Sequence, residues 1–245
     1  MTDVTIRFLG SGDAFGDGGR FQACILLDSP AGRILLDCGA TSLVAMKRTE
    51  LDPSSIETVL VTHLHGDHFG GLPFLILDGQ FSRRQLPLRI VGPPGVRERV
   101  EAAMEVFFSG SSTIQRRFPV DFVEFADRTP LALGPIEVTP VAVDHASGAP
   151  AFALRVRSSG KTVAYSGDTA WTDALVELAS GADLFIAEAY TAHRPVRFHL
   201  DYDDILAYAG GLTARRIILT HMGPSMLALP GAAFERAYDG LTITL

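Results

Sequence analysis

Three histidines and one aspartate fall within a run of six residues, and all four are common metal ligands: His63, His65, Asp67 and His68. An apolar, β-branched run at 56–61 precedes them and predicts a buried strand. Residues two apart at a strand end can point the same way, so His63 and His65 are expected to share one site. Gly66 is expected to allow a tight turn that brings Asp67 and His68 towards a second site nearby.

Imidazole and carboxylate groups of this kind suit Zn²⁺ or a comparable transition metal. The competing interpretation is a polar loop in which Asp67 caps a helix. A single histidine would favour that alternative. Three histidines behind a buried strand favour metal binding.

Further candidate ligands follow predicted strands elsewhere in the chain: His145, Asp168 and His221. In α/β proteins, ligands and catalytic groups collect at strand ends. Asp168 stands in a Ser-Gly-Asp-Thr run and would on its own be interpreted as a turn residue or a helix cap. In the company of so many histidines it is predicted to be a ligand, with Gly167 permitting a close approach.

Short apolar runs bounded by turn residues predict the strands that must position these groups. The predicted strands span 4–9, 23–27, 33–36, 56–61, 88–91, 118–125, 136–143, 152–156, 162–165, 184–187, 216–219 and 241–245. Helical patterns occupy 40–48, 72–77, 96–108, 173–178 and 202–209. Strands in meander-like series, with helices inserted, predict an α/β protein in which helices cover packed sheets.

Composition limits the classes of function. Of the 245 residues, 47% are hydrophobic, which is enough for a sizeable core, and no linker or repeat divides residues 1–245, so a single domain is expected. The net charge of -7 argues against a nucleic-acid partner held by bulk electrostatics. Without a signal peptide or membrane span, and with Cys24 and Cys38 in apolar runs as buried free thiols, the sequence predicts a soluble, cytoplasmic protein.

The ordered motifs resemble the metallo-β-lactamase superfamily over essentially the whole chain. They are His-x-His-x-Asp-His at 63–68, the lone His145, Gly-Asp-Thr at 167–169 and Leu-Thr-His at 219–221. The resemblance implies a four-layer αβ/βα sandwich with two divalent metal ions, Zn²⁺ or Mn²⁺, that share a nucleophilic hydroxide. It also implies one metal held by His63, His65 and His145, a second held by Asp67, His68 and His221, and Asp168 as the bridge.

Other motifs resemble the phosphodiesterase branch, which includes ribonuclease Z and phosphoribosyl cyclic phosphate phosphodiesterase. These are Phe-Leu-Gly-Ser-Gly at 8–12, Leu-Asp-Cys-Gly at 36–39, and His199 before a predicted helix. In that branch a histidine at this position contacts a phosphoryl oxygen or the leaving group. Glu188, at a strand end, is a candidate to orient it. His199, Glu188 and Asp67 are therefore the candidate catalytic residues, with a polar residue at a helix start as the alternative for His199.

Two departures from that branch shift the expected substrate. The interval from His145 to Asp168 is too short for the long arm with which ribonuclease Z grips tRNA. Residues 12–19 lack the cysteines of the zinc loop found in phosphoribosyl cyclic phosphate phosphodiesterase, the enzyme of phosphonate breakdown. A small linear or cyclic phosphodiester is therefore the expected substrate, and tRNA 3′-processing is disfavoured.

The sequence is also compatible with other functions. Hydrolysis of a carboxyl ester, lactone, thioester or β-lactam is the main alternative, and metal binding without turnover is another. A redox diiron protein is disfavoured, because that branch replaces the second histidine of the cluster with glutamate, and here it is His65.

Several charged residues outside the motifs have less defined roles. Arg194 and Arg197 could recognise a substrate phosphate or belong to a solvated loop. His193 is expected at the surface, and the arginine pairs at 83–84 and 116–117 are expected on solvated faces, with an oligomer contact as their alternative. A homodimer is compatible with the sequence.

Overall fold

The computed structural model describes residues 3–245, and within them the strands form two seven-stranded mixed sheets. The first sheet has the order β14-β1-β2-β3-β4-β5-β6, with bounds Thr242–Thr244, Thr5–Gly10, Cys24–Ser29, Gly32–Leu36, Thr58–Leu60, Leu88–Gly92 and Val120–Glu124. The second has the order β13-β12-β11-β10-β9-β8-β7, with bounds Glu235–Arg236, Ile217–Thr220, Leu184–Glu188, Lys161–Tyr165, Ala151–Ser158, Ile136–Val143 and Leu131–Leu133.

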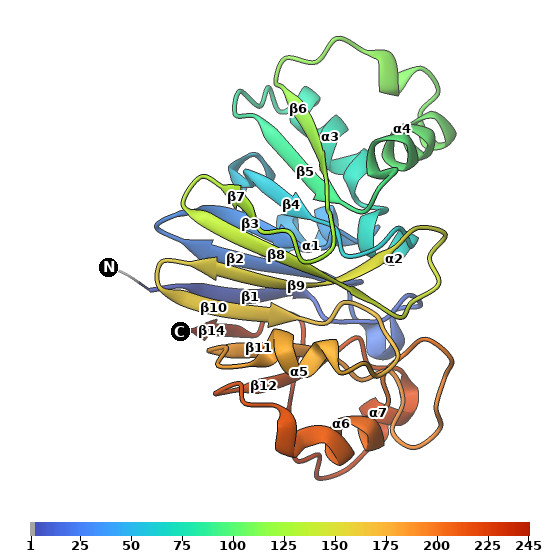
Figure 1. The fold of residues 1–245 in the computed structure, drawn as a ribbon. Helices are drawn as coiled ribbons and strands as arrows, with labels where there is room; N and C mark the ends of the chain where they lie inside the picture. Colours follow the sequence, from blue (N-terminus) through green and yellow to red (C-terminus); the bar gives the residue numbers. More distant parts are fainter. Residues whose placement is uncertain (1–2) are drawn as a thin grey trace.

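Helices cover the outer face of each sheet, so the molecule has four layers (Figure 1). Against the first sheet pack α1, α3 and α4, with bounds Ser42–Arg48, Leu72–Phe81 and Val96–Phe107. Against the second pack α5, α6 and α7, with bounds Ala174–Ala179, Tyr202–Tyr208 and Pro224–Ala228. The short helix α2, Gly66–Phe69, follows β4, and the 3₁₀ turns are η1 to η4, at Asp17–Gly19, Pro53–Ser55, Ser111–Thr113 and Ala209–Gly211.

Strand alternation divides the apolar residues between these layers. Phe8, Leu36 and Val156 are fully buried between the two sheets, whereas their strand neighbours Leu9 and Leu35 face the first helical layer. Side chains two apart on a strand share a face, so one sheet can supply two cores. The predicted αβ/βα sandwich is therefore confirmed.

Most predicted elements are present, with bounds that shift by at most four residues. The missed ones are β7, α2, α7 and β13, which are too short for a period to show. The meander expectation is only partly right, because β3 to β6 run parallel, as do β10 to β13. Among the described residues no helix is long and apolar enough to cross a bilayer.

Arg84 corrects another expectation. We expected both members of its arginine pair on a solvated face, but its side chain is buried and donates to the carbonyl oxygens of Leu86 and Pro87 at 2.6 and 2.7 Å. Its guanidinium satisfies backbone groups where the chain approaches β5.

Candidate functional site

The predicted ligands come together at one edge of the sandwich, on the right of Figure 1, where β4, β8, β10 and β12 end. The first group consists of His63, His65 and His145, with one ring nitrogen from each within 4.8 Å of the others. The closest approach joins His145 Nε2 and His65 Nδ1 at 3.1 Å. Residues 80 positions apart thus meet because their strands end at the same edge.

The second group consists of Asp67, His68, Asp168 and His221, all buried. His68 Nε2 lies 3.2 Å from Asp67 Oδ2 and 3.3 Å from Asp168 Oδ1. His221 Nε2 lies 3.2 Å from Asp67 Oδ2 and 3.5 Å from Asp168 Oδ2. Asp168 Oδ2 is also 3.9 Å from His63 Nε2, so this carboxylate lies between the two groups.

Several polar atoms in these groups are buried without a hydrogen-bond partner among the described residues: His63 Nε2, His68 Nε2 and Asp168 Oδ1. Leaving such an atom unsatisfied costs about 1–3 kcal/mol. Divalent cations accept this donor set of imidazole nitrogens and carboxylate oxygens. The residues present therefore fit divalent metal ions.

The electrostatics of the second group favour a bound cation. Burial acts to lower the pKa of His221, but the charge of Asp168, the hydrogen bond with Asp67 and the charge of Glu188 raise it to about 10. Burial also acts to lower the pKa of His68. The charges of the surrounding carboxylates outweigh burial and raise this pKa well above its usual range. These carboxylates hold positive charge in place, and metal binding must displace protons from both rings.

Two of the ring nitrogens that point away from the centre have a fixed acceptor. His68 Nδ1 donates to Asp37 Oδ2 at 2.7 Å, and His145 Nδ1 donates to the Phe198 carbonyl oxygen at 2.8 Å. Such contacts fix the tautomer and leave Nε2 free for a ligand.

Asp37 is a site residue that we did not predict as one. It is fully buried, and besides His68 it accepts hydrogen bonds from the Thr62 amide at 2.7 Å and the Tyr165 hydroxyl at 2.9 Å. Its φ of 60° turns the chain sharply after β3. A polar residue directly after an apolar strand was the signal, and it is the same signal that identified Asp168.

The close approach predicted for Gly167 is confirmed, whereas the special turn predicted for Gly66 is not. Gly167 has a φ of 57°, and a Cβ there would lie 2.9 Å from Thr62 Cβ. Gly66 is the first residue of α2, and a Cβ there would meet nothing within 4 Å. The start of α2 is an ordinary helix start without a glycine-specific conformation, and it places Asp67 and His68 in the second group.

His199 and Glu188 are hydrogen-bonded to each other, His199 Nδ1 donating to Glu188 Oε1. The second oxygen of Glu188 accepts from the amides of Thr169 and Leu200, at 2.9 and 3.2 Å. Burial acts to lower the pKa of His199, but the hydrogen bond and charge of Glu188 raise it overall. Both residues also fall in a third group that could hold a cation, with Asp168 and His221. Geometry alone therefore allows His199 to be either a donor to substrate or a ligand.

A cavity of about 240 Å³ opens above these groups. Its polar lining residues are His65, Asp67, Asp168, His199 and His221, and Ala14, Phe15, Tyr190 and Val196 complete it. Neither Arg194 nor Arg197 is among them, and the Arg197 guanidinium lies 4.4 Å from the centre of the Phe198 ring. The solvated-loop interpretation is the better one for both, and His193 is exposed as expected, beside Asp203.

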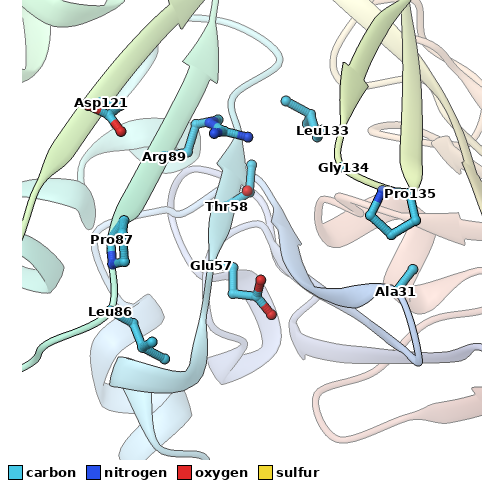
Figure 2. A pocket seen from close by; sticks show the side chains of 10 residues that line it. All are labelled: Ala31, Glu57, Thr58, Leu86, Pro87, Arg89, Asp121, Leu133, Gly134 and Pro135. Atoms are coloured by element: carbon cyan, nitrogen blue, oxygen red, sulfur yellow. The ribbon is translucent and has the colours of Figure 1, made fainter.

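A larger hollow of about 590 Å³ lies at the opposite ends of the strands (Figure 2). Thr58 begins β4 there, and Glu57 and Arg89 are the charged side chains near its centre. None of the described residues that line it is a histidine or cysteine, so they offer none of the nitrogen or sulfur ligands that a transition metal prefers. The ligand-rich edge is the site with catalytic chemistry.

Residues 32–222 match the family described as "Beta-lactamase superfamily domain", and the chain belongs to the metallo-β-lactamase superfamily. An uncharacterized protein of Mycobacterium tuberculosis is 32% identical over 91% of this chain and 82% of its own length. Ribonuclease Z of Mycobacterium marinum is 25% identical over 92% of this chain and 88% of its own length. The crystal structure of the short form of human tRNase Z superposes with a TM-score of 0.78, at 25% identity over 98% of both chains.

These relationships define the class of protein: a hydrolase of the metallo-β-lactamase superfamily with ribonuclease Z-like relatives and a cluster of histidines and aspartates able to bind metal. The fold implies divalent metal ions.

Proposed function

We propose that this hydrolase is a two-metal phosphodiesterase acting on a small linear or cyclic phosphodiester. In this proposal His63, His65 and His145 hold one ion, Asp67, His68 and His221 hold the other, and Asp168 bridges them. Two of the sets of ligand atoms support the assignment, because the atoms within each set lie within 4.8 Å of one another. Asp168 lies next to His63 as well as His68 and His221.

The observation that carries the choice of phosphodiester is the pair His199–Glu188 beside the metal groups. Glu188 occupies Nδ1 of His199, so Nε2 is the nitrogen available to a substrate in the cavity. When bound, two divalent ions supply an activated water and neutralise phosphoryl charge. As the bond between phosphorus and the leaving oxygen breaks, His199 would donate its Nε2 proton to that oxygen, and Glu188 would stabilise the charged ring. The oxygen becomes the hydroxyl of a free alcohol when the ester is linear and a hydroxyl of the opened product when it is cyclic.

The size of the site supports a small substrate. A cavity of about 240 Å³ is below the range typical for drug-sized ligands, about 300–1,000 Å³. β9 and β10 occupy the interval between His145 and Asp168, where a tRNA-gripping arm would be needed. The net charge of -7 also disfavours a polyanion as partner.

A panel of substrates tests the proposal. Protein loaded with Zn²⁺ or Mn²⁺ is assayed with bis(p-nitrophenyl) phosphate, cyclic nucleotides, a cyclic ribose phosphate, a lactone and nitrocefin. We expect turnover of at least one phosphodiester that far exceeds turnover of the lactone and nitrocefin. Faster hydrolysis of either carboxyl compound would assign the site to ester or lactam chemistry instead. The two metal loadings also show which ion supports the higher rate.

We extend the proposal to a cytoplasmic enzyme that works without nucleic acid, either as a monomer or as a homodimer. The two cysteines, buried and unpaired, support a reducing compartment. Fractionation of cells tests the cytoplasmic location. Size-exclusion chromatography with light scattering tests the oligomeric state.

A further inference from the structure

The rim of the catalytic cavity carries a phenylalanine that does not belong to the protein core. Phe15 lines the cavity, yet 82% of its surface is exposed. Most phenylalanine side chains are buried, because exposing the apolar ring to water is unfavourable. Phe15 therefore has the position and the chemistry of a side chain whose partner is a ligand.

The loop that carries Phe15 is held in place on both sides of it. The Ala14 carbonyl oxygen accepts from Gln22 Nε2 at 2.8 Å, and the buried Asp13 accepts from the Asp17 amide at 2.9 Å. The η1 turn that follows packs against α7, as the dark blue turn on the right of Figure 1 shows. A ring presented by a fixed loop loses little freedom when it binds, which favours contact with a ligand.

The same cavity has a second exposed apolar side chain from a different loop. Val196 precedes His199 by three residues and is 39% exposed. Tyr190 adds a further ring, whose centre is 4.9 Å from that of His199. The cavity thus combines a polar, ligand-rich floor with an apolar and aromatic rim.

We infer that Phe15, with Val196, binds a planar aromatic ring attached to the phosphate ester that the floor receives. The inference rests on the proposed function, since it assumes a phosphate at the metal groups. Aromatic rings stack on one another through their faces, and such a contact strengthens binding about 5- to 30-fold. Phe15 is accordingly a specificity-determining residue and takes no part in the chemical step.

Calorimetry on Zn²⁺-loaded protein tests this with two pairs of ligands that differ by an aromatic ring. One pair is phenyl phosphate and methyl phosphate, and the other is adenosine 5′-monophosphate and ribose 5-phosphate. A preference within the first pair indicates a ring bonded directly to the phosphate oxygen, and one within the second indicates a nucleoside. We expect wild-type protein to prefer the aromatic member of at least one pair about 5- to 30-fold, Phe15→Ala to lose that preference, and Phe15→Trp to keep it.

Phe81→Ala is the matched control, because Phe81 is 85% exposed and lies at the end of α3, outside the cavity. It should bind all four ligands as wild type does. The inference is wrong if wild-type protein shows no preference in either pair, or if Phe15→Ala retains it. Because calorimetry measures binding and not turnover, a protein that cleaves no phosphodiester still gives a decisive result here.

Discussion

At the residue scale, a substitution of His199 distinguishes a role in catalysis from a role in metal binding. Its Nδ1 is bonded to Glu188, and the ring lines the cavity. Removing a positioned acid costs about 10²–10⁴ in rate. We therefore predict that His199→Ala keeps two metals and loses phosphodiesterase turnover by about that factor. The loss should be smaller for a p-nitrophenolate leaving group, which needs little protonation, than for an alkyl or ribose one.

Steady-state rates with both kinds of substrate, alongside metal analysis, check this prediction. His193→Ala is the control, because His193 is exposed and pairs with Asp203 outside the cavity. A His199→Ala protein that sheds one metal would make His199 a ligand within the group that also contains Asp168, Glu188 and His221. Parent rates on both substrates would remove its catalytic role.

The residues at the site differ in how well the sequence predicts them. His63, His65 and His68 stand out because histidine is rare and they are clustered. Asp37 and Phe15 do not, because a single aspartate after a strand or a phenylalanine near a glycine-rich turn has many ordinary explanations. The signal for Asp37 is therefore too common to assign a role, which its contacts with Thr62 and Tyr165 show. Phe15 is singled out by its place in the cavity wall.

At the scale of elements, α2 must sit close to the turn after β3. Gly39 lies in that turn, and a Cβ on it would approach the Asp67 carbonyl oxygen to 2.3 Å. We predict that Gly39→Ala displaces Asp67 and His68, lowers the metal content and destabilises the fold by about 1–3 kcal/mol. Metal analysis and thermal unfolding measure both effects.

Gly66→Ala is the matched control for Gly39→Ala, since its added Cβ meets open space at the first position of the same helix. Alanine also favours a helix over glycine, so this variant should be as stable as wild type or slightly more so. Equal stability and metal content in the two variants would contradict the close packing of α2 against Gly39.

The elements themselves were predictable where they are long or buried. The strand at Ile136–Val143 is predicted to the residue, because its apolar alternation extends over eight positions. The order of strands in the sheets was not predictable. Parallel pairing of β4 with β5 depends on the crossover through α3, which apolar periodicity does not reveal.

At the scale of the whole molecule, the reactivity of two buried thiols reports on global unfolding. Burial raises the pKa of Cys24 to about 12 and that of Cys38 well above its ordinary value, so neither forms the reactive thiolate near pH 8. The unfolded chain ionises these thiols near pH 8.5, so the stability of the fold begins to fall above that pH and goes on falling until the pH reaches the raised pKa values of the folded protein.

We therefore predict that 5,5′-dithiobis(2-nitrobenzoic acid) labels neither cysteine in the folded protein at pH 8. Labelling should begin at the urea concentration at which circular dichroism reports unfolding. A single transition shared by both probes would support our proposal that residues 1–245 are one domain. Rapid labelling in the absence of urea would show that the layer between the first sheet and its helices opens locally.

We propose that seven side chains hold two divalent ions per chain: His63, His65, Asp67, His68, His145, Asp168 and His221. The most direct test saturates the protein with Zn²⁺ or Mn²⁺, removes unbound metal by desalting, and counts the bound ions by inductively coupled plasma mass spectrometry. We predict close to two equivalents for the wild type and a loss at both sites in Asp168→Ala. A folded wild-type protein that never holds more than one equivalent, or an Asp168→Ala variant that keeps both, would contradict the account.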